Sequence, residues 1–180
     1  MPAAIASFVE RLAKARIGAT FNFYRDGAGA EVRRARLAEY LASREEASII
    51  LVGEAAGYRG ARVSGIPFTS ERQLSGCGPA EASATIVRRV LQELGLEESV
   101  LCWNLVPTHP HRPGRPESNR RPTRPEIAAG RTFLAALIAK RRVVALGRLA
   151  QRELETRYVR HPAHGGAAAF RAGLIESLDD

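Results

Sequence analysis

Apolar residues are spaced along this chain in two alternating ways. In some segments they recur every three or four residues, which places them on one face of a helix. In others they form short continuous runs rich in β-branched residues, typical of strands buried on both faces of a parallel sheet. The first spacing predicts helices over residues 3–15, 30–45, 78–96, 123–140, 148–155 and 166–178, and the second predicts strands over 48–54, 99–107, 141–147 and 156–163, the last running out into a loop.

Local signals at the ends of two predicted helices support this reading. Pro79 suits the first turn of one helix and Gly95 its end, while Thr123 is a suitable cap for another. Strands that alternate with helices predict right-handed crossovers and a parallel sheet. We therefore expect an α/β protein, a three-layer α/β/α sandwich with a central four-stranded parallel sheet, formed by residues 1–180 as a single domain.

Polar residues gather where the predicted strands end. In parallel sheets of this kind, ligands bind just past the carboxyl ends of the strands. The first strand ends with Gly53 and Glu54 and is followed by a loop that reaches Glu71, and the second contains Asn104 near its end. The fourth runs into His161. These residues are expected to meet at one edge of the sheet.

Charge points to an anionic partner. The net charge is +8, and every basic residue except Lys14 and Lys140 is an arginine. This sign favours a partner such as nucleic acid. Residues 111–125, called the Pro-Arg segment below, are either a solvated linker or an arm that contacts phosphates; they contain four prolines and the arginines Arg112, Arg115, Arg120, Arg121 and Arg124.

Several classes of protein are disfavoured. No apolar run approaches the roughly 20 residues of a membrane span, and the N-terminus lacks a signal-peptide pattern, so a cytoplasmic protein is expected. Cys77 and Cys102 alone cannot form a four-thiolate cluster or zinc site, and we expect no metal. The stretch "GEAAGYRG" matches neither common phosphate-binding loop, although a small nucleotide-binding α/β protein stays an alternative.

Taken together, the motifs "VGEAAGYRG…SGIPFTSE", "WNLVP…NRRPTRPEIAAGRTFL", "VVALGRLAQ" and "RHPAHGG" resemble the uracil-DNA glycosylase superfamily. The resemblance covers about residues 48–175. It implies an enzyme that flips a damaged base, usually uracil, out of DNA and hydrolyses its N-glycosidic bond without a metal, cofactor or covalent intermediate. DNA that contains uracil or another deaminated base is then the expected partner.

The resemblance also implies roles for particular residues. Phe68 matches the aromatic residue that stacks on the flipped base, and Asn104 matches the asparagine that reads its polar edge. His161 matches the histidine that hydrogen-bonds the negative charge developing on the leaving base. Gly53 would let the backbone approach the base, and Tyr58 could exclude the 5-methyl group of thymine.

The catalytic acid departs from the family pattern. Many members carry an aspartate or asparagine where this chain has Ala55. Glu54, which matches an acidic position of the iron-sulfur members, and Glu71, beyond the stacking Phe68, are two candidates between which the sequence does not choose. Those members hold their cluster with four cysteines, so this chain with two is expected to be a divergent, cluster-free branch.

The remaining candidates would contact DNA. Arg59 and the arginines of the Pro-Arg segment would hold phosphates, and His164 is the nearest candidate for the wedge that fills the gap left by the flipped base. The sequence thus predicts a monomeric, monofunctional uracil-DNA glycosylase of base-excision repair. The alternative, motivated by Ala55, is a catalytically inactive relative that binds damaged or abasic DNA. The predicted phosphate contacts are Arg59, Arg112, Arg115, Arg120 and Arg121.

Overall fold

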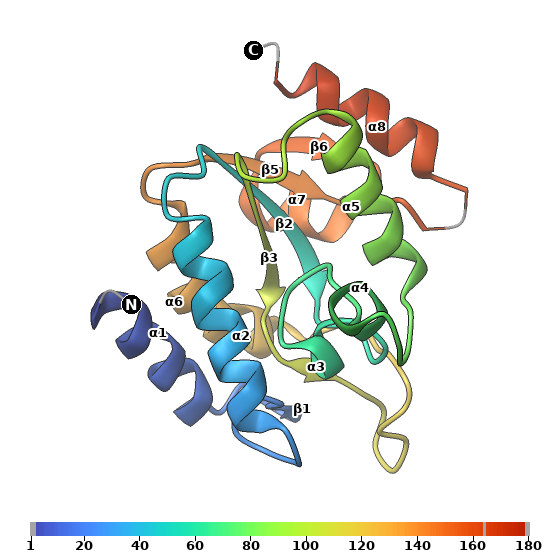
Figure 1. Cartoon of the computed structure of the whole chain (residues 1–180). Coiled ribbons are helices and arrows are strands. Elements are labelled where there is room, and N and C mark those ends of the chain that lie inside the picture. Colours follow the sequence, from blue (N-terminus) through green and yellow to red (C-terminus); the bar gives the residue numbers. More distant parts are fainter. Residues whose placement is uncertain (1–2, 164, 179–180) are drawn as a thin grey trace.

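A four-stranded parallel sheet lies at the centre of the protein, seen here in a computed structural model that describes residues 3–163 and 165–178 (Figure 1). Its strands follow the order β3 (Val100–Val106), β2 (Ile49–Ala55), β5 (Arg142–Leu146) and β6 (Arg157–Val159). In the register of β2 and β3, Gly53 lies beside Asn104. The predicted α/β architecture with four parallel strands is confirmed.

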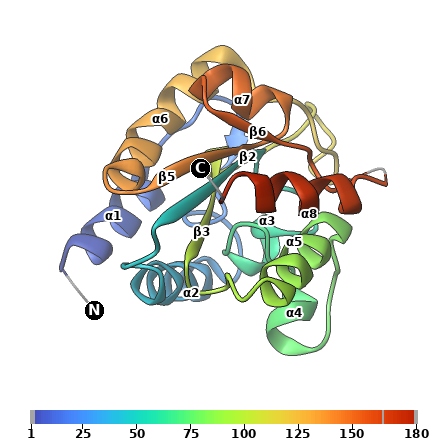
Figure 2. The same cartoon turned by 90° about the horizontal axis from the view of Figure 1, so that it is seen from above.

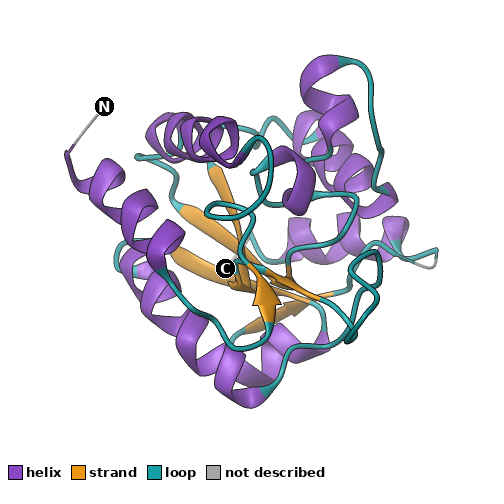
Figure 3. Ribbon diagram, turned by 90° about the horizontal axis from the view of Figure 1, so that it is seen from below, coloured by secondary structure: helices purple, strands orange, loops and turns teal. Residues whose placement is uncertain are grey.

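Helices cover both faces of the sheet, so that it forms the middle of three layers (Figures 2 and 3). Alternation along β2 explains why, because Ile50 and Val52 join one apolar cluster and Ile49 and Leu51 join the other. The first cluster is covered by α1 (Ala3–Lys14), α2 (Ala30–Ser43), α6 (Arg124–Ile138) and α7 (Arg148–Leu154), and the second by α5 (Ala82–Glu93) and α8 (Ala167–Glu176).

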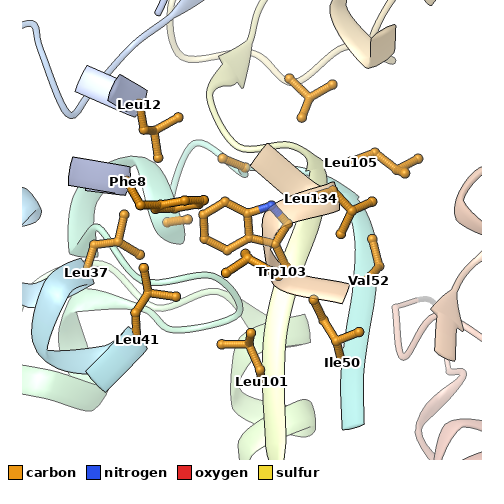
Figure 4. Close-up of a cluster of buried hydrophobic side chains, with 14 of the residues drawn as sticks. Phe8, Leu12, Leu37, Leu41, Ile50, Val52, Leu101, Trp103, Leu105 and Leu134 are labelled. Carbon is orange, nitrogen blue, oxygen red and sulfur yellow. The ribbon is translucent and has the colours of Figure 1, made fainter. Parts of the chain in front are cut away.

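Trp103 of β3 lies at the centre of the first cluster (Figure 4). Its indole is fully buried, and the ring of Phe8 from α1 meets it edge-on at 5.7 Å between centroids. Leu37 of α2 and Leu134 of α6 close the cluster from two other helices. A buried aromatic of this size contributes a large apolar area, so one strand residue ties three helices to the sheet.

Local sequence signals predicted the start of α6 correctly but not the start of α5. Thr123 caps α6 as predicted, because its hydroxyl accepts the Glu126 N–H at 3.4 Å and its own N–H donates to the Glu126 carboxylate at 2.8 Å. The predicted start of the helix at residue 78 is wrong, since α5 begins at Ala82. Gly78 is left-handed at φ 81° and Glu81 is extended, so Pro79 lies outside the helix.

Four short elements were not predicted. An antiparallel pair joins β1 (Thr20–Phe21) to β4 (His109–Pro110), and two single-turn helices, α3 (Ala61–Ser64) and α4 (Glu71–Ser75), follow β2. Elements of two to five residues have too few positions to show a periodicity, and their formation depends on tertiary contacts. No helix within the described residues has the length and apolar character needed to cross a membrane.

The outer side of β3 receives a side chain from α2. The Tyr40 hydroxyl accepts the N–H of Cys102 at 2.7 Å and donates to the carbonyl oxygen of the same residue at 3.4 Å. Burial raises the pKa of Tyr40 well above its usual value, so the hydroxyl keeps its proton. Cys102 is buried and Cys77 exposed, and both are free thiols.

Candidate active site

A small pocket opens at the carboxyl end of the sheet, where β2, β3 and the chain after β6 meet. Its volume of about 90 Å³ is far below the roughly 300–1,000 Å³ of pockets that enclose a drug-sized ligand, so it suits a single ring better than a whole nucleotide. The structure therefore brings together four residues predicted from separate segments. The lining consists of Glu54, Ala55, Gly57, Ala61, Phe68, Glu81, Ser83, Asn104 and His161.

Gly53 forms the support on which the ring of Phe68 rests. A Cβ atom at position 53 would collide with that ring and lie 2.9 Å from Oδ1 of Asn104. Phe68 itself has a left-handed backbone at φ 51°, a conformation that costs energy for a residue with a bulky side chain. A strained backbone and a glycine together place the aromatic ring at the pocket.

Asn104 presents an unsatisfied polar atom to this pocket. The residue is only 3% exposed, and its Oδ1 is buried without a hydrogen-bond partner anywhere in residues 3–163 and 165–178. An unsatisfied buried group of this kind costs about 1–3 kcal/mol, and a ligand with a matching polar edge would satisfy it.

His161 lies on the other side of the pocket, after β6. Its ring centroid is 6.5 Å from that of Phe68. The Nδ1 atom accepts the N–H of Ala163 at 3.2 Å, which places the proton of the neutral ring on Nε2. The imidazole can thus act as a hydrogen-bond donor without a positive charge.

Two glutamates line the pocket, and only one of them was predicted. Burial raises the pKa of Glu54, although nearby Arg121 favours the charged form. Glu81, the residue before α5, also has its pKa raised by burial, against a hydrogen bond from Ser83. The sequence signal for Glu81 was indirect, because Gly57 and Gly60 mark a backbone that another group approaches closely.

Glu71, the other predicted acid, is held elsewhere. It begins α4, and the Arg36 guanidinium donates to both its carboxylate oxygens at 2.7 and 3.0 Å. The hydrogen bonds from Arg36 lower the pKa of Glu71. This carboxylate does not line the pocket.

The arginines of the Pro-Arg segment fall into two groups. Arg120 donates to the two Glu126 carboxylate oxygens at 2.8 and 2.6 Å, so this predicted phosphate contact is engaged within the protein. Arg112, Arg115 and Arg121 are exposed. The segment is therefore anchored at Arg120, while its other arginines lie at the surface, where Arg115 forms an exposed ion pair with Glu117 at 3.4 Å.

Two contacts tie the Pro-Arg segment to the pocket loop, defined as residues 56–60 between β2 and α3. The side-chain oxygen of Asn119 accepts the Tyr58 N–H at 2.9 Å. His109, buried and not predicted as a site residue, lies between the loop and the segment, with Nδ1 2.9 Å from the Ala56 carbonyl oxygen and Nε2 3.3 Å from that of Pro116. Burial lowers the pKa of His109.

The remaining predicted residues lie at or beyond the rim. The Tyr58 ring packs against the guanidinium of Arg62 at 4.7 Å and is not part of the pocket lining. Arg59 is exposed. His164, the predicted wedge, lies outside the described residues. Within the part of the chain that the structure describes, no group of three or more His, Cys, Asp or Glu side chains is arranged to hold a metal ion.

Comparisons with known proteins support the same reading of the fold. The sequence model of the uracil DNA glycosylase superfamily matches residues 41–176. Among solved structures, that of wild-type Pedobacter heparinus SMUG2 matches with a TM-score of 0.70 over 97% of both chains, at 15% sequence identity. A search of curated proteins finds no match.

Proposed function

The chain belongs to the uracil DNA glycosylase superfamily, and we propose that it extrudes uracil, and other deaminated bases, from DNA and hydrolyses the N-glycosidic bond. The family accounts for the coarser part of this statement, a glycosidase of DNA repair that acts on DNA. The part that we propose is that this chain is catalytically active and that uracil and other deaminated bases are its substrates.

The observation that carries the proposal is the unsatisfied amide of Asn104 beside the ring of Phe68. An extruded pyrimidine needs a flat apolar face on which to stack and a polar partner for its edge. An amide offers an acceptor and a donor side by side, which matches the adjacent carbonyl and N–H groups of uracil. The small pocket supplies both within the space of one ring.

The remaining residues suit hydrolysis in which the base leaves as an anion. The Nε2–H group of neutral His161 can donate to an oxygen of the base as negative charge develops there. A carboxylate of the pocket would hold the attacking water and stabilise positive charge on the sugar. Of the two acids predicted from the sequence, Glu54 lines the pocket and Glu71 is bound to Arg36, so the geometry favours Glu54 over Glu71.

DNA would be held mainly through its phosphates. The exposed guanidinium groups of Arg59, Arg112, Arg115 and Arg121 are available for such contacts, whereas Arg120 serves to anchor the Pro-Arg segment. Phosphate contacts do not depend on the base sequence of the DNA, and the affinity that they provide falls as the salt concentration rises. We also propose that Tyr58 excludes the 5-methyl group of thymine. His164 is proposed as the wedge that fills the gap left by the flipped base.

Base release from matched duplexes tests this function. Duplexes that contain uracil, hypoxanthine, xanthine or thymine at one position would be incubated with excess wild-type protein and with Asn104→Ala. We expect release of uracil by the wild type and a rate reduced about 10²–10³-fold in the variant, the usual effect of removing one hydrogen-bonding group from such a site.

A gel-shift assay with the same duplexes separates the alternatives. Binding to damaged DNA without release of any base by the wild type would contradict the proposal and favour an inactive, DNA-binding relative. The reason to consider this alternative is Ala55, which stands where many family members carry an acid. Thermal unfolding of Asn104→Ala serves as the control for folding.

A further inference from the structure

Glu81 occupies a space in the pocket that two glycines leave open. A Cβ atom at Gly57 would lie 2.5 Å from Oε1 of Glu81, and one at Gly60 would overlap Oε2. The pocket loop can therefore follow its path around this carboxyl group only because both positions lack a side chain. Glu81 comes from a distant part of the sequence, the extended residue that precedes α5.

This carboxyl group has no cationic partner among the described residues. Glu71 and Glu126, which are also partly or fully buried, are each bound by an arginine at 2.7 and 2.6 Å. Among the residues that the structure describes, Glu81 has a hydrogen bond from Ser83 to favour its charged form, and burial outweighs it. Burial of an unpaired charge destabilises a protein, so a structural role alone does not account for the group.

Ala55 and Glu81 both line the pocket. Position 55 is where many members of the family are expected to carry the acid, and here it bears only a methyl group. Glu54, the adjacent acid, lies within the electrostatic influence of Arg121, which makes it a weaker base. Glu81 is thus the acidic residue of the pocket lining that has no neutralising cation among the described residues.

We infer that the Glu81 carboxylate is the general base of this pocket and holds the attacking water, in the role that Ala55 cannot fill. This inference rests on the proposed function. The water oxygen bonds to C1′ of the deoxyribose as the bond from C1′ to the base nitrogen breaks, and that electron pair leaves with the base. One water proton passes through the Glu81 carboxylate to solvent, and the base anion, held by Asn104 and His161, takes a proton on release.

The decisive comparison is among Glu81→Gln, Glu54→Gln and Glu93→Gln under single-turnover conditions with uracil-containing DNA. Glu93 is the matched control, because it is an exposed glutamate at the end of α5, the helix that follows Glu81, and pairs there with Arg89 and Arg171. Loss of a positioned acid or base costs about 10²–10⁴-fold in rate, so we expect Glu81→Gln to be slower by at least about 100-fold. Glu54→Gln should lose less than about tenfold, and Glu93→Gln should match the wild type.

Stability distinguishes this role from a structural one. A carboxyl group whose pKa is raised by folding resists ionisation in the folded state, so its cost to stability is present above that pKa and disappears as the pH falls below the ordinary glutamate range. Glu81→Gln should therefore unfold at the same or a higher temperature than the wild type at pH 8, without this gain at pH 4. A residue kept for structure alone would instead lower the unfolding temperature.

The pH dependence of the rate gives a third measurement. The wild-type rate should fall as the pH drops through the raised pKa of Glu81, and Glu81→Gln should lack this decline. Release by Glu81→Gln within about threefold of the wild type, with Glu54→Gln inactive, would overturn the inference and leave the proposed function intact. Failure of the wild type to release any base, although it binds the DNA, would overturn both.

Discussion

Two glutamates near the carboxyl end of the sheet are packed against glycine backbone, and they differ in what surrounds their charge. Glu126 is 1% exposed, and a Cβ atom at Gly18 would lie 2.5 Å from its Cγ. Its carboxylate accepts from the guanidinium of Arg120 and from the N–H of Thr123. Glu81 is seated against Gly57 and Gly60 in a similar way but has no arginine beside it within the described residues.

The consequence is opposite for the two carboxyl groups. Burial works to raise the pKa of Glu126, but hydrogen bonds from Arg120 and Thr123 outweigh it and the pKa is lowered. At Glu81 burial prevails and the pKa is raised. The charge of Glu126 is therefore expected to stabilise the fold, whereas the charge of Glu81 is expected to oppose folding, which agrees with the catalytic role that we propose for it.

Removal of the charge of Glu126 should have the largest effect on stability. Glu126→Gln leaves the guanidinium of Arg120 partly buried without a counter-ion, and breaking a buried pair costs about 3–5 kcal/mol. We expect the free energy of unfolding, measured by urea denaturation at pH 7, to fall by about 3 kcal/mol. The rate of base release per folded molecule should change little, because Glu126 does not line the pocket.

Two controls sharpen this prediction. The double variant Glu126→Gln with Arg120→Gln should recover part of the loss, since neither charge is then left alone. A lowered pKa contributes stability above the ordinary glutamate pKa and loses it as the pH falls through the folded value, so the difference between Glu126→Gln and wild type should shrink at acidic pH. An undiminished difference would contradict the role given to this pair.

Glu71 should behave as a weaker version of Glu126. Its pair with Arg36 is less buried, with side chains 19% and 28% exposed, so Glu71→Gln should lower the free energy of unfolding by about 1–2 kcal/mol. Release of uracil should stay within about threefold of the wild type in the same single-turnover assay. A loss of 100-fold or more in Glu71→Gln would restore this residue as the catalytic acid.

The smallest expected effect is a change in the salt dependence of DNA binding, and the neighbouring residues Arg120 and Arg121 should differ in it. Arg121 is exposed, and if it contacts one phosphate, Arg121→Gln should reduce the slope of log affinity against log salt by about 0.9 without a loss of stability. Arg120→Gln should lower stability and leave the slope near the wild-type value, because its guanidinium binds Glu126. Fluorescence anisotropy with labelled duplex DNA at several salt concentrations measures both slopes.

The parts of the molecule that depend on local chemistry could be predicted from the sequence. The cap at Thr123 needs only a hydroxyl and a glutamate three residues later, and the alternation of strands and helices follows from periodicity. The meeting of Glu54, Asn104 and His161 at one pocket follows from the rule for the carboxyl ends of parallel strands. Phe68 was placed there by its family motif.

Contacts between distant segments could not be predicted in this way. Arg36 and Glu71 are 35 positions apart, and nothing in either local sequence specifies the other as a partner. The start of α5 was placed too early because Pro79 suits a first helical turn, whereas its carbonyl oxygen accepts the N–H of Arg72 in α4 instead. As a result Glu81 was assigned to the interior of a helix and its approach to the pocket loop was missed.

The contact between Tyr40 and Cys102 occupies backbone groups at an open edge of the sheet. In the order β3-β2-β5-β6, the outer side of β3 is an edge of the sheet, and unpaired N–H and C=O groups along an edge can recruit a strand of another molecule. The tyrosine hydroxyl already occupies both groups of Cys102, midway along the strand. A strand of a second molecule would have to displace the Tyr40 hydroxyl before it could pair with β3 at Cys102. The tyrosine side chain therefore disfavours edge-to-edge pairing at this strand.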